Sequence, residues 1–133
     1  MKSRMKDQNI TTKNAKLSLE DEILHLTIDY KNGITIDDAK EIVSAAIKLS
    51  KGEKFLCIMK SLNYSLPSRE VRAYPVHDEV AKYIQAIAFI AINPVANIAA
   101  RFFIKISKPP FPFKLFTDEE EAIKWLKNFQ IKK

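Results

Sequence analysis

The segment from Ser61 to Arg69 gathers most of the polar groups that could bind a ligand. It follows a short apolar run, Phe55–Met59, that is typical of a buried strand. In open α/β sheets, binding sites lie beyond the carboxyl ends of the strands. Hydroxyl, amide and guanidinium groups placed there could hold an anion at a helix start, and the alternative is ordinary loop and helix-cap chemistry. The candidate residues for phosphorylation or partner binding are Ser61, Asn63, Tyr64, Ser65, Ser68 and Arg69.

A second candidate region is aromatic and basic. The stretch Arg101–Lys105 holds two phenylalanines, and Lys108 and a Pro-Pro-Phe-Pro connector follow it. Aromatic side chains beside cations suit a lipid headgroup surface, an acidic protein groove or single-stranded nucleic acid. The alternative is that the phenylalanines fill the core and the cations are solvated. The candidate ligand or interface residues are Arg101, Phe102, Phe103, Lys105 and Phe111.

The remaining residues offer no catalytic arrangement. Cys57 lies inside an apolar run, away from the exposure and the activating base that a nucleophile needs. His25 and His77 lack the Cys/His/Asp spacing of a zinc site. With Gly33 and Gly52 as the only glycines, the chain has no P-loop and no Gly-rich dinucleotide turn. We therefore predict a non-enzymatic protein with no catalytic residue, no metal and no cofactor.

Composition and charge limit the class of protein. The chain has 133 residues, 47% hydrophobic and 29% charged, which indicates one folded domain. Most of the net charge of +6 lies near the N-terminus, so we predict a flexible basic tail over 1–14 and one domain over 15–133. The charge outside the tail is too weak to favour nucleic acid. No apolar segment reaches the roughly 20 residues of a membrane span, no signal peptide is seen, and a single cysteine favours the cytoplasm.

Hydrophobic periodicity predicts the elements that position these residues. Alternating apolar residues over 15–20 and 24–29 indicate a hairpin, and the continuous apolar runs Phe55–Met59 and Ala86–Ile92 indicate parallel strands buried on both faces. Helical spacing follows Thr35, Ser68 and Asn93, with a break at Pro75, and a last helix capped by Thr117 follows a strand over 113–116. The order β-β-α-β-α-β-α-β-α predicts an α/β domain. Its mixed sheet is mostly parallel, with an N-terminal antiparallel hairpin and about four to five helices.

The helix expected over 94–107 has two apolar faces. We assign one face to the core: Val95, Ile98, Ala99, Phe102 and Ile106. The second face, Ala96, Ala100 and Phe103, is left over, and its small residues would let another backbone approach. We predict a homodimer through this face or the adjoining connector 108–113. The alternative is that the hairpin, the Pro75-broken helix or a bound ligand covers that face within one chain.

The predicted order of elements resembles the STAS-like, SpoIIAA-like fold of anti-sigma-factor antagonists. The likeness covers about 15–129 and is strongest over 109–126, where a Pro-containing connector and an acidic capping run lead into Ala122, Trp125 and Leu126. The resemblance implies a module that binds partner proteins and is switched by phosphorylation of a serine after the buried strand. Ser61 stands at the end of that strand, where Lys60 replaces the Asp of those relatives, and Ser65 and Ser68 lie further along the chain.

Two functions follow as expectations. The first is a non-enzymatic regulatory or protein-interaction module that uses the 61–72 region. The second is a carrier or sensor of a small apolar or lipid-like ligand, as some members of the wider STAS-like group are thought to be. In that case Phe102, Phe103, Ile106 and Phe111 would line or gate a cavity, and Arg101 or Lys105 would meet an anionic head.

Overall fold

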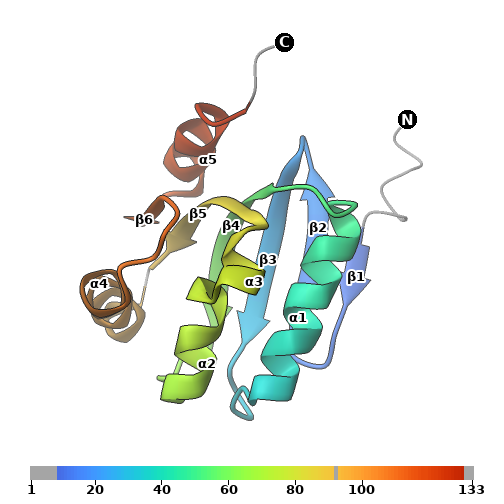
Figure 1. Ribbon diagram of the computed structural model, residues 1–133. Helices are drawn as coiled ribbons and strands as arrows, with labels where there is room; N and C mark the ends of the chain where they lie inside the picture. Colours follow the sequence, from blue (N-terminus) through green and yellow to red (C-terminus); the bar gives the residue numbers. More distant parts are fainter. Residues whose placement is uncertain (1–8, 92, 131–133) are drawn as a thin grey trace.

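Six strands lie side by side in the order in which they occur in the chain (Figure 1). The computed structural model describes residues 9–91 and 93–130. The strands are β1 Asn9–Thr11, β2 Ala15–Glu20, β3 Ile23–Asp29, β4 Phe55–Leu62, β5 Ile84–Ile90 and β6 Phe113–Phe116. The helices are α1 Ile36–Leu49, α2 Arg69–Ala73, α3 Asp78–Ala81, α4 Pro94–Ser107 and α5 Glu119–Lys127, with a 3-10 turn, η2, over Tyr74–Val76.

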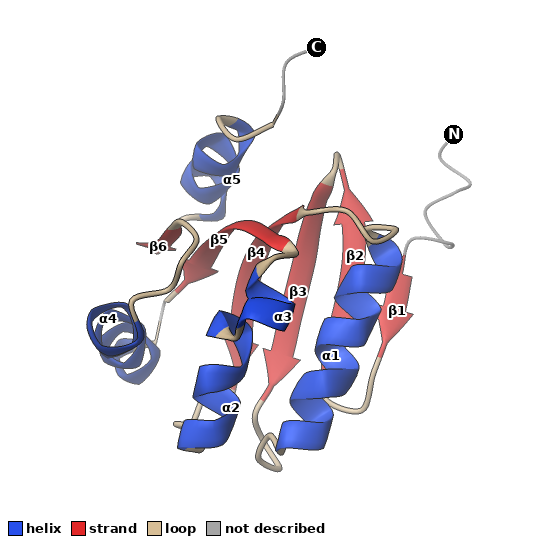
Figure 2. Ribbon diagram, in the orientation of Figure 1, coloured by secondary structure: helices blue, strands red, loops and turns tan. Residues whose placement is uncertain are grey.

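Strand direction explains where the helices lie. β1, β2 and β3 pair antiparallel, and β3, β4, β5 and β6 pair parallel, which confirms the predicted mixed sheet. Each parallel crossover moves to the next strand in the same direction, and right-handed crossovers of this kind place their helices on one face. Figure 2 shows α1, then α2 and α3, then α4 following one another across the sheet. The last helix, α5, packs on the opposite face.

The sheet begins earlier than the sequence indicated. Residues 9–11 fall in the segment predicted to be a flexible tail, yet they form β1 and pair antiparallel with β2. Asn14, also placed in the tail, is buried, and its carbonyl accepts a hydrogen bond from the Asp29 N–H at 2.7 Å. Backbone pairing needs no apolar pattern, so a three-residue edge strand leaves little trace in the sequence. The rest of the predicted tail, residues 1–8, lies outside the described residues.

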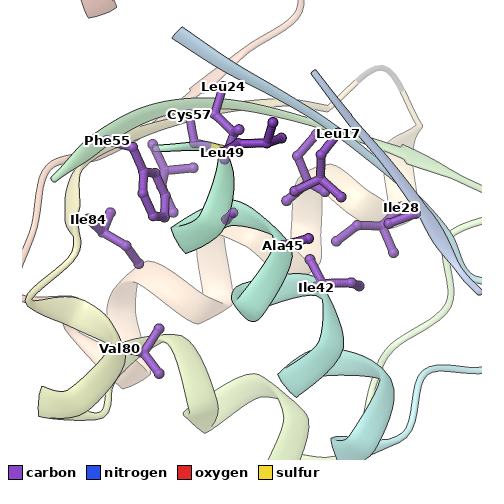
Figure 3. Close-up of a cluster of buried hydrophobic side chains, with 14 of the residues drawn as sticks. Leu17, Leu24, Ile28, Ile42, Ala45, Leu49, Phe55, Cys57, Val80 and Ile84 are labelled. Atoms are coloured by element: carbon purple, nitrogen blue, oxygen red, sulfur yellow. The ribbon is translucent and has the colours of Figure 1, made fainter. Parts of the chain in front are cut away.

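The core has two layers because the strands alternate their side chains between the two faces. On β4, Phe55 and Cys57 point toward α1, whereas Leu56 and Ile58 point toward α5. Figure 3 shows the first of these layers, in which Leu24 and Leu49 meet Cys57 between the sheet and α1. The prediction that this run is buried on both faces is confirmed.

The three long helices each begin at a residue whose side chain accepts a hydrogen bond from a backbone N–H of the first turn. Thr35 and Asp38 form a capping box at the start of α1: the Asp38 N–H donates to Thr35 Oγ1 at 3.1 Å, and the Thr35 N–H donates to Asp38 Oδ2 at 3.0 Å. Asn93 caps α4 as predicted. The prediction that Thr117 caps α5 is wrong by one residue, because Asp118 Oδ1 accepts the Glu120 N–H at 3.1 Å and so satisfies the first turn.

Candidate functional site

The loop that follows β4 is fastened to the end of β3. The Tyr30 N–H donates to the Leu62 carbonyl at 2.9 Å, and the Asn63 amide donates to Asp29 Oδ1 at 3.0 Å. Asn63 has a φ of +51°, a left-handed conformation that Asn tolerates better than most residues. The hydrogen bond from Asn63, aided by the Lys31 N–H, lowers the pKa of the Asp29 carboxyl. The ring of Tyr64 packs at 4.8 Å from that of Tyr30, so the loop has a defined shape.

The three candidate serines differ in access. The Ser61 hydroxyl oxygen is buried beside the Tyr30 side chain. Ser65 is exposed. Ser68 is also exposed, but its hydroxyl accepts the Val71 N–H at 3.3 Å and caps α2. The loop therefore presents Ser65 and Ser68, rather than Ser61, at its surface, together with the exposed Arg69.

The end of β4 and the loop after it expose two large apolar side chains. Leu62 is 51% exposed and Leu66 is 61% exposed, on either side of the half-buried Tyr64. Sequence reasoning missed both leucines, because no periodicity marks an isolated apolar residue in a polar loop. The contacts of Asn63 and Tyr64 hold the backbone between the two leucines at the carboxyl edge of the parallel strands.

In the second candidate region, α4 packs on the sheet through the face opposite to the one predicted. Ala96 and Ala100 are 2% and 6% exposed and pack with Phe89 and Ala91 of the sheet, and Phe103 lies 5.1 Å from the Phe113 ring. The face assigned to the core is largely in solvent: Val95, Ile98, Phe102 and Ile106 are 57%, 69%, 56% and 62% exposed. Small residues allow a helix to lie close to the sheet, and α4 is the last helix of its row, so its large residues face outward (Figure 1).

This reversal corrects two predictions. A dimer interface on Ala96, Ala100 and Phe103 is ruled out because the chain itself covers that face. The residues expected to line an apolar cavity do not converge either: Phe102 points to solvent, Phe103 packs on the sheet, and Phe111 belongs to the core beside α1.

A cavity of about 300 Å³ does lie beside α4, and polar and charged side chains line it together with Leu115 and Phe116. Arg101 and Asn97 form one wall, where the Arg101 Nε–H donates to Asn97 Oδ1 at 2.7 Å. Asp118 and Glu121, at the start of α5, contribute the opposing carboxylates. Lys105 is exposed on α4 and does not line this cavity. Charged groups of both signs make a poor site for an apolar ligand.

The two candidate regions adjoin one another. Met59 and Tyr64 pack against the small cluster that contains Ala96 and Ala100, so the loop after β4 contacts the buried side of α4. Both regions follow parallel strands at the same edge of the sheet, as the topology requires. Sequence reasoning named both regions but gave no reason to place them together.

Cys57 and His25 lie outside both candidate regions. Cys57 is buried, and desolvation raises the pKa of its thiol to about 12, so the thiolate does not form near neutral pH. His25 lies 3.9 Å from a Glu20 carboxylate oxygen. Among residues 9–91 and 93–130, no group of three His, Cys, Asp or Glu side chains is placed to hold a metal. No helix in the same ranges combines the length and the apolar character that crossing a membrane requires.

The mixed sheet, with three helical crossovers on one face and α5 on the other, defines the class as a SpoIIAA-like α/β domain. A solved structure supports this class: an uncharacterised protein of the DUF3478 family with a SpoIIAA-like fold, from Shewanella loihica PV-4. It is 14% identical, has a TM-score of 0.59, and the match covers 88% of this chain and 98% of that one. At this identity the likeness concerns the fold alone.

The chain belongs to the family described as Domain of unknown function (DUF7793), whose model matches residues 17–130. A protein of unknown function from Arthrobacter sp. FB24 is 23% identical, over 84% of this chain and 97% of that one, with a TM-score of only 0.29. No curated protein matches the chain.

Proposed function

We propose that the protein is a non-enzymatic regulatory module that binds a partner protein through the surface of residues 62–69, which we name the loop surface. The observation that carries the proposal is the exposure of Leu62, the last residue of β4, and of Leu66 in the loop after it, where Asn63 is fastened to β3. Exposed apolar side chains cost solvation free energy, and an ordered backbone reduces the entropy lost on binding.

The surroundings of the two leucines suit a protein partner. Asn63, Ser65, Ser68 and Arg69 are exposed around them and supply donors and acceptors for a polar rim. An apolar centre with a polar rim is the usual anatomy of a protein–protein interface, and Arg is enriched in such interfaces. α2 and η2, which follow the loop, contain no buried residue, so the solvent-accessible surface continues beyond the loop surface.

The accessible serines provide a means of regulation. Phosphorylation of Ser65 or Ser68 would add a charge of about −2 beside the exposed leucines. That charge would oppose an apolar contact at Leu66 while leaving the fold intact, since Ser65 is exposed and has no structural hydrogen bond within the described residues. We propose that the module acts in the cytoplasm, where kinases and reducing conditions coexist.

Affinity capture from a lysate of the source organism tests the proposal. The bait is the wild-type chain beside Leu66→Asp and Ser65→Asp, and the matched control is Ser44→Asp, which introduces the same side chain at an exposed position on α1, away from the loop surface and from α4. We expect a protein that is retained by the wild type and by the control and is lost with Leu66→Asp. Equal retention by all four baits contradicts the loop surface, and no retention by any bait contradicts the interaction role.

A further inference from the structure

The outer side of α4 carries a continuous apolar stripe. Val95, Ile98, Phe102 and Ile106 are separated by three, four and four residues, which places them along one side of a helix. All four are more than half exposed, and the only other large hydrophobic residues exposed to this extent in the described chain lie on the loop surface. No helix covers this side, because α4 ends the row of helices on its face of the sheet (Figure 1).

The charges beside the stripe are divided between its two ends. Lys105 and Lys108 lie at the C-terminal end of α4, and neither forms an ion pair within the described residues. The N-terminal half and the middle of the helix lie beside carboxylates, since Asn97 and Arg101 line the same cavity as Asp118 and Glu121. The C-terminal end is therefore basic, whereas the two carboxylates exceed the single charge of Arg101 in the cavity beside the rest of the helix.

The spacing of the stripe is nearly the same when read in either direction. If two copies of α4 pack antiparallel, Val95 faces Ile106 of the other copy, because both lie equally far from the helix centre, and Ile98 lies within one residue of the position opposite Phe102 of the other copy. The same arrangement brings Lys105 and Lys108 of one copy toward Asp118 and Glu121 of the other. A parallel arrangement instead places Lys105 and Lys108 of one copy against the same two lysines of the other.

We propose that two copies of the chain associate through this stripe, with their α4 helices antiparallel about a two-fold axis. Such an interface is isologous, so each copy contributes the same apolar stripe and the same pair of opposite charges. This proposal is independent of the loop surface, which stays open in the dimer to bind a partner. The proposed interface lies on the exposed face of α4, opposite to the face of Ala96, Ala100 and Phe103 that the sequence predicted for a dimer.

A second copy fits the charges better than an anionic membrane does. A membrane attracts Arg101, Lys105 and Lys108, but it repels the carboxylates of Asp118 and Glu121 that line a cavity with Arg101. The symmetric partner offers both signs. A helix of 14 residues is about 21 Å long and buries less than the roughly 800 Å² per partner of a standard interface. We therefore expect a dissociation constant of about 10 to 100 μM.

Disulfide trapping tests the geometry. Val95→Cys and Ile106→Cys are made as separate single variants at exposed positions, and Lys48→Cys on α1 is the exposed control. The native Cys57 stays in place because its buried thiol is unreactive. In an antiparallel dimer, positions 95 and 106 approach each other across the interface, whereas two copies of position 95 lie about 16 Å apart, beyond the reach of a disulfide.

The expected result is a disulfide-linked dimer when the two variants are mixed and oxidised at about 100 μM, with little in either variant alone and none with the control. Linked dimers in each variant alone indicate parallel packing and overturn the proposal. A wild-type chain that sediments as a monomer at about 200 μM also overturns it.

Charge exchange tests the polar contacts in the folded protein. Lys105→Glu should weaken association about tenfold, because reversal replaces attraction by repulsion, and adding Glu121→Lys should restore it. Ile98→Asp should give a monomer with unchanged circular dichroism. Failure of Glu121→Lys to rescue overturns the antiparallel register. Co-sedimentation of the wild type, but not Ile98→Asp, with phosphatidylglycerol vesicles and no dimer in solution would assign the stripe to a membrane instead.

Discussion

The orientation of α4 can be tested by a pair of substitutions with opposite expected effects. Phe102 is 56% exposed, so Phe102→Ala loses the burial of roughly half of one aromatic side chain, which lowers the free energy of unfolding by about 1 kcal/mol. Ala has the better helix propensity, which offsets part of this loss. The expected cost is about 0.5 kcal/mol. If Phe102 were in the core, as the sequence pattern indicated, the same change would cost about 3–5 kcal/mol.

The partner substitution is Ala96→Leu. Ala96 is 2% exposed and packs beside Phe89 and Ala91, so three additional carbon atoms have no space. Overpacking of this kind costs about 1–3 kcal/mol. On a solvent-facing position the same change would be nearly neutral.

Urea unfolding followed by fluorescence measures both effects. The single tryptophan, Trp125, packs 5.6 Å from Phe116 and 5.0 Å from Phe129, so its emission reports loss of the packed state. The measurement is made at about 1 μM, where the proposed dimer is dissociated. A cost above about 3 kcal/mol for Phe102→Ala together with a neutral Ala96→Leu would refute the packing of α4 described above.

Three further predictions concern the cap of α1, the buried thiol and the loop. Thr35→Ala removes the capping box and should lower the free energy of unfolding by about 0.5–2 kcal/mol in the same urea assay, whereas Thr35→Ser should retain most of it; equal losses would contradict the assigned bonds. Burial raises the pKa of Cys57 from 9.0 to about 12, so between these pH values the unfolded chain binds fewer protons and stability falls as pH rises, by about 2 kcal/mol at about pH 10.5. Cys57→Val should lack this part of the alkaline loss, and parallel stability–pH curves for the two proteins would argue against it. Asn63→Ala should cost about 1–2 kcal/mol in urea because of the positive φ and the lost bond to Asp29, and Asn63→Gly should cost clearly less, so equal costs would show that the conformation is not the cause.

Local patterns predicted most of the fold. The alternation in β2 and β3, the continuous apolar run of β4 and the Asn-Pro start of α4 each depend on a few neighbouring residues, and the structure confirms them. β1 was missed because its three residues include a single apolar one, Ile10, which is too few to show a period-2 pattern. A strand of this kind becomes visible only when its partner strand is known.

The candidate site was predicted less completely, for a different physical reason. The sequence identified two apolar faces on α4, but which face packs depends on how closely the helix can approach the sheet. Ala96 and Ala100 permit that approach, whereas Ile98 and Phe102 on the other face would hold the helix away. The exposure of Leu62 and Leu66 likewise depends on the contacts of Asn63 and Tyr64 with residues more than thirty positions away. Such contacts leave no periodic signal.

The most direct test of the binding role is site-specific photo-crosslinking in the source cells. A photoreactive phenylalanine analogue replaces Leu66 on the loop surface, and a matched chain carries it at Lys40, an exposed position on α1. The proposed function predicts one protein that becomes linked to position 66 after illumination, is absent with position 40, and disappears when Ser65→Asp is added. Illumination that links no protein to position 66, or the same proteins to both positions, would contradict a binding role for the loop surface.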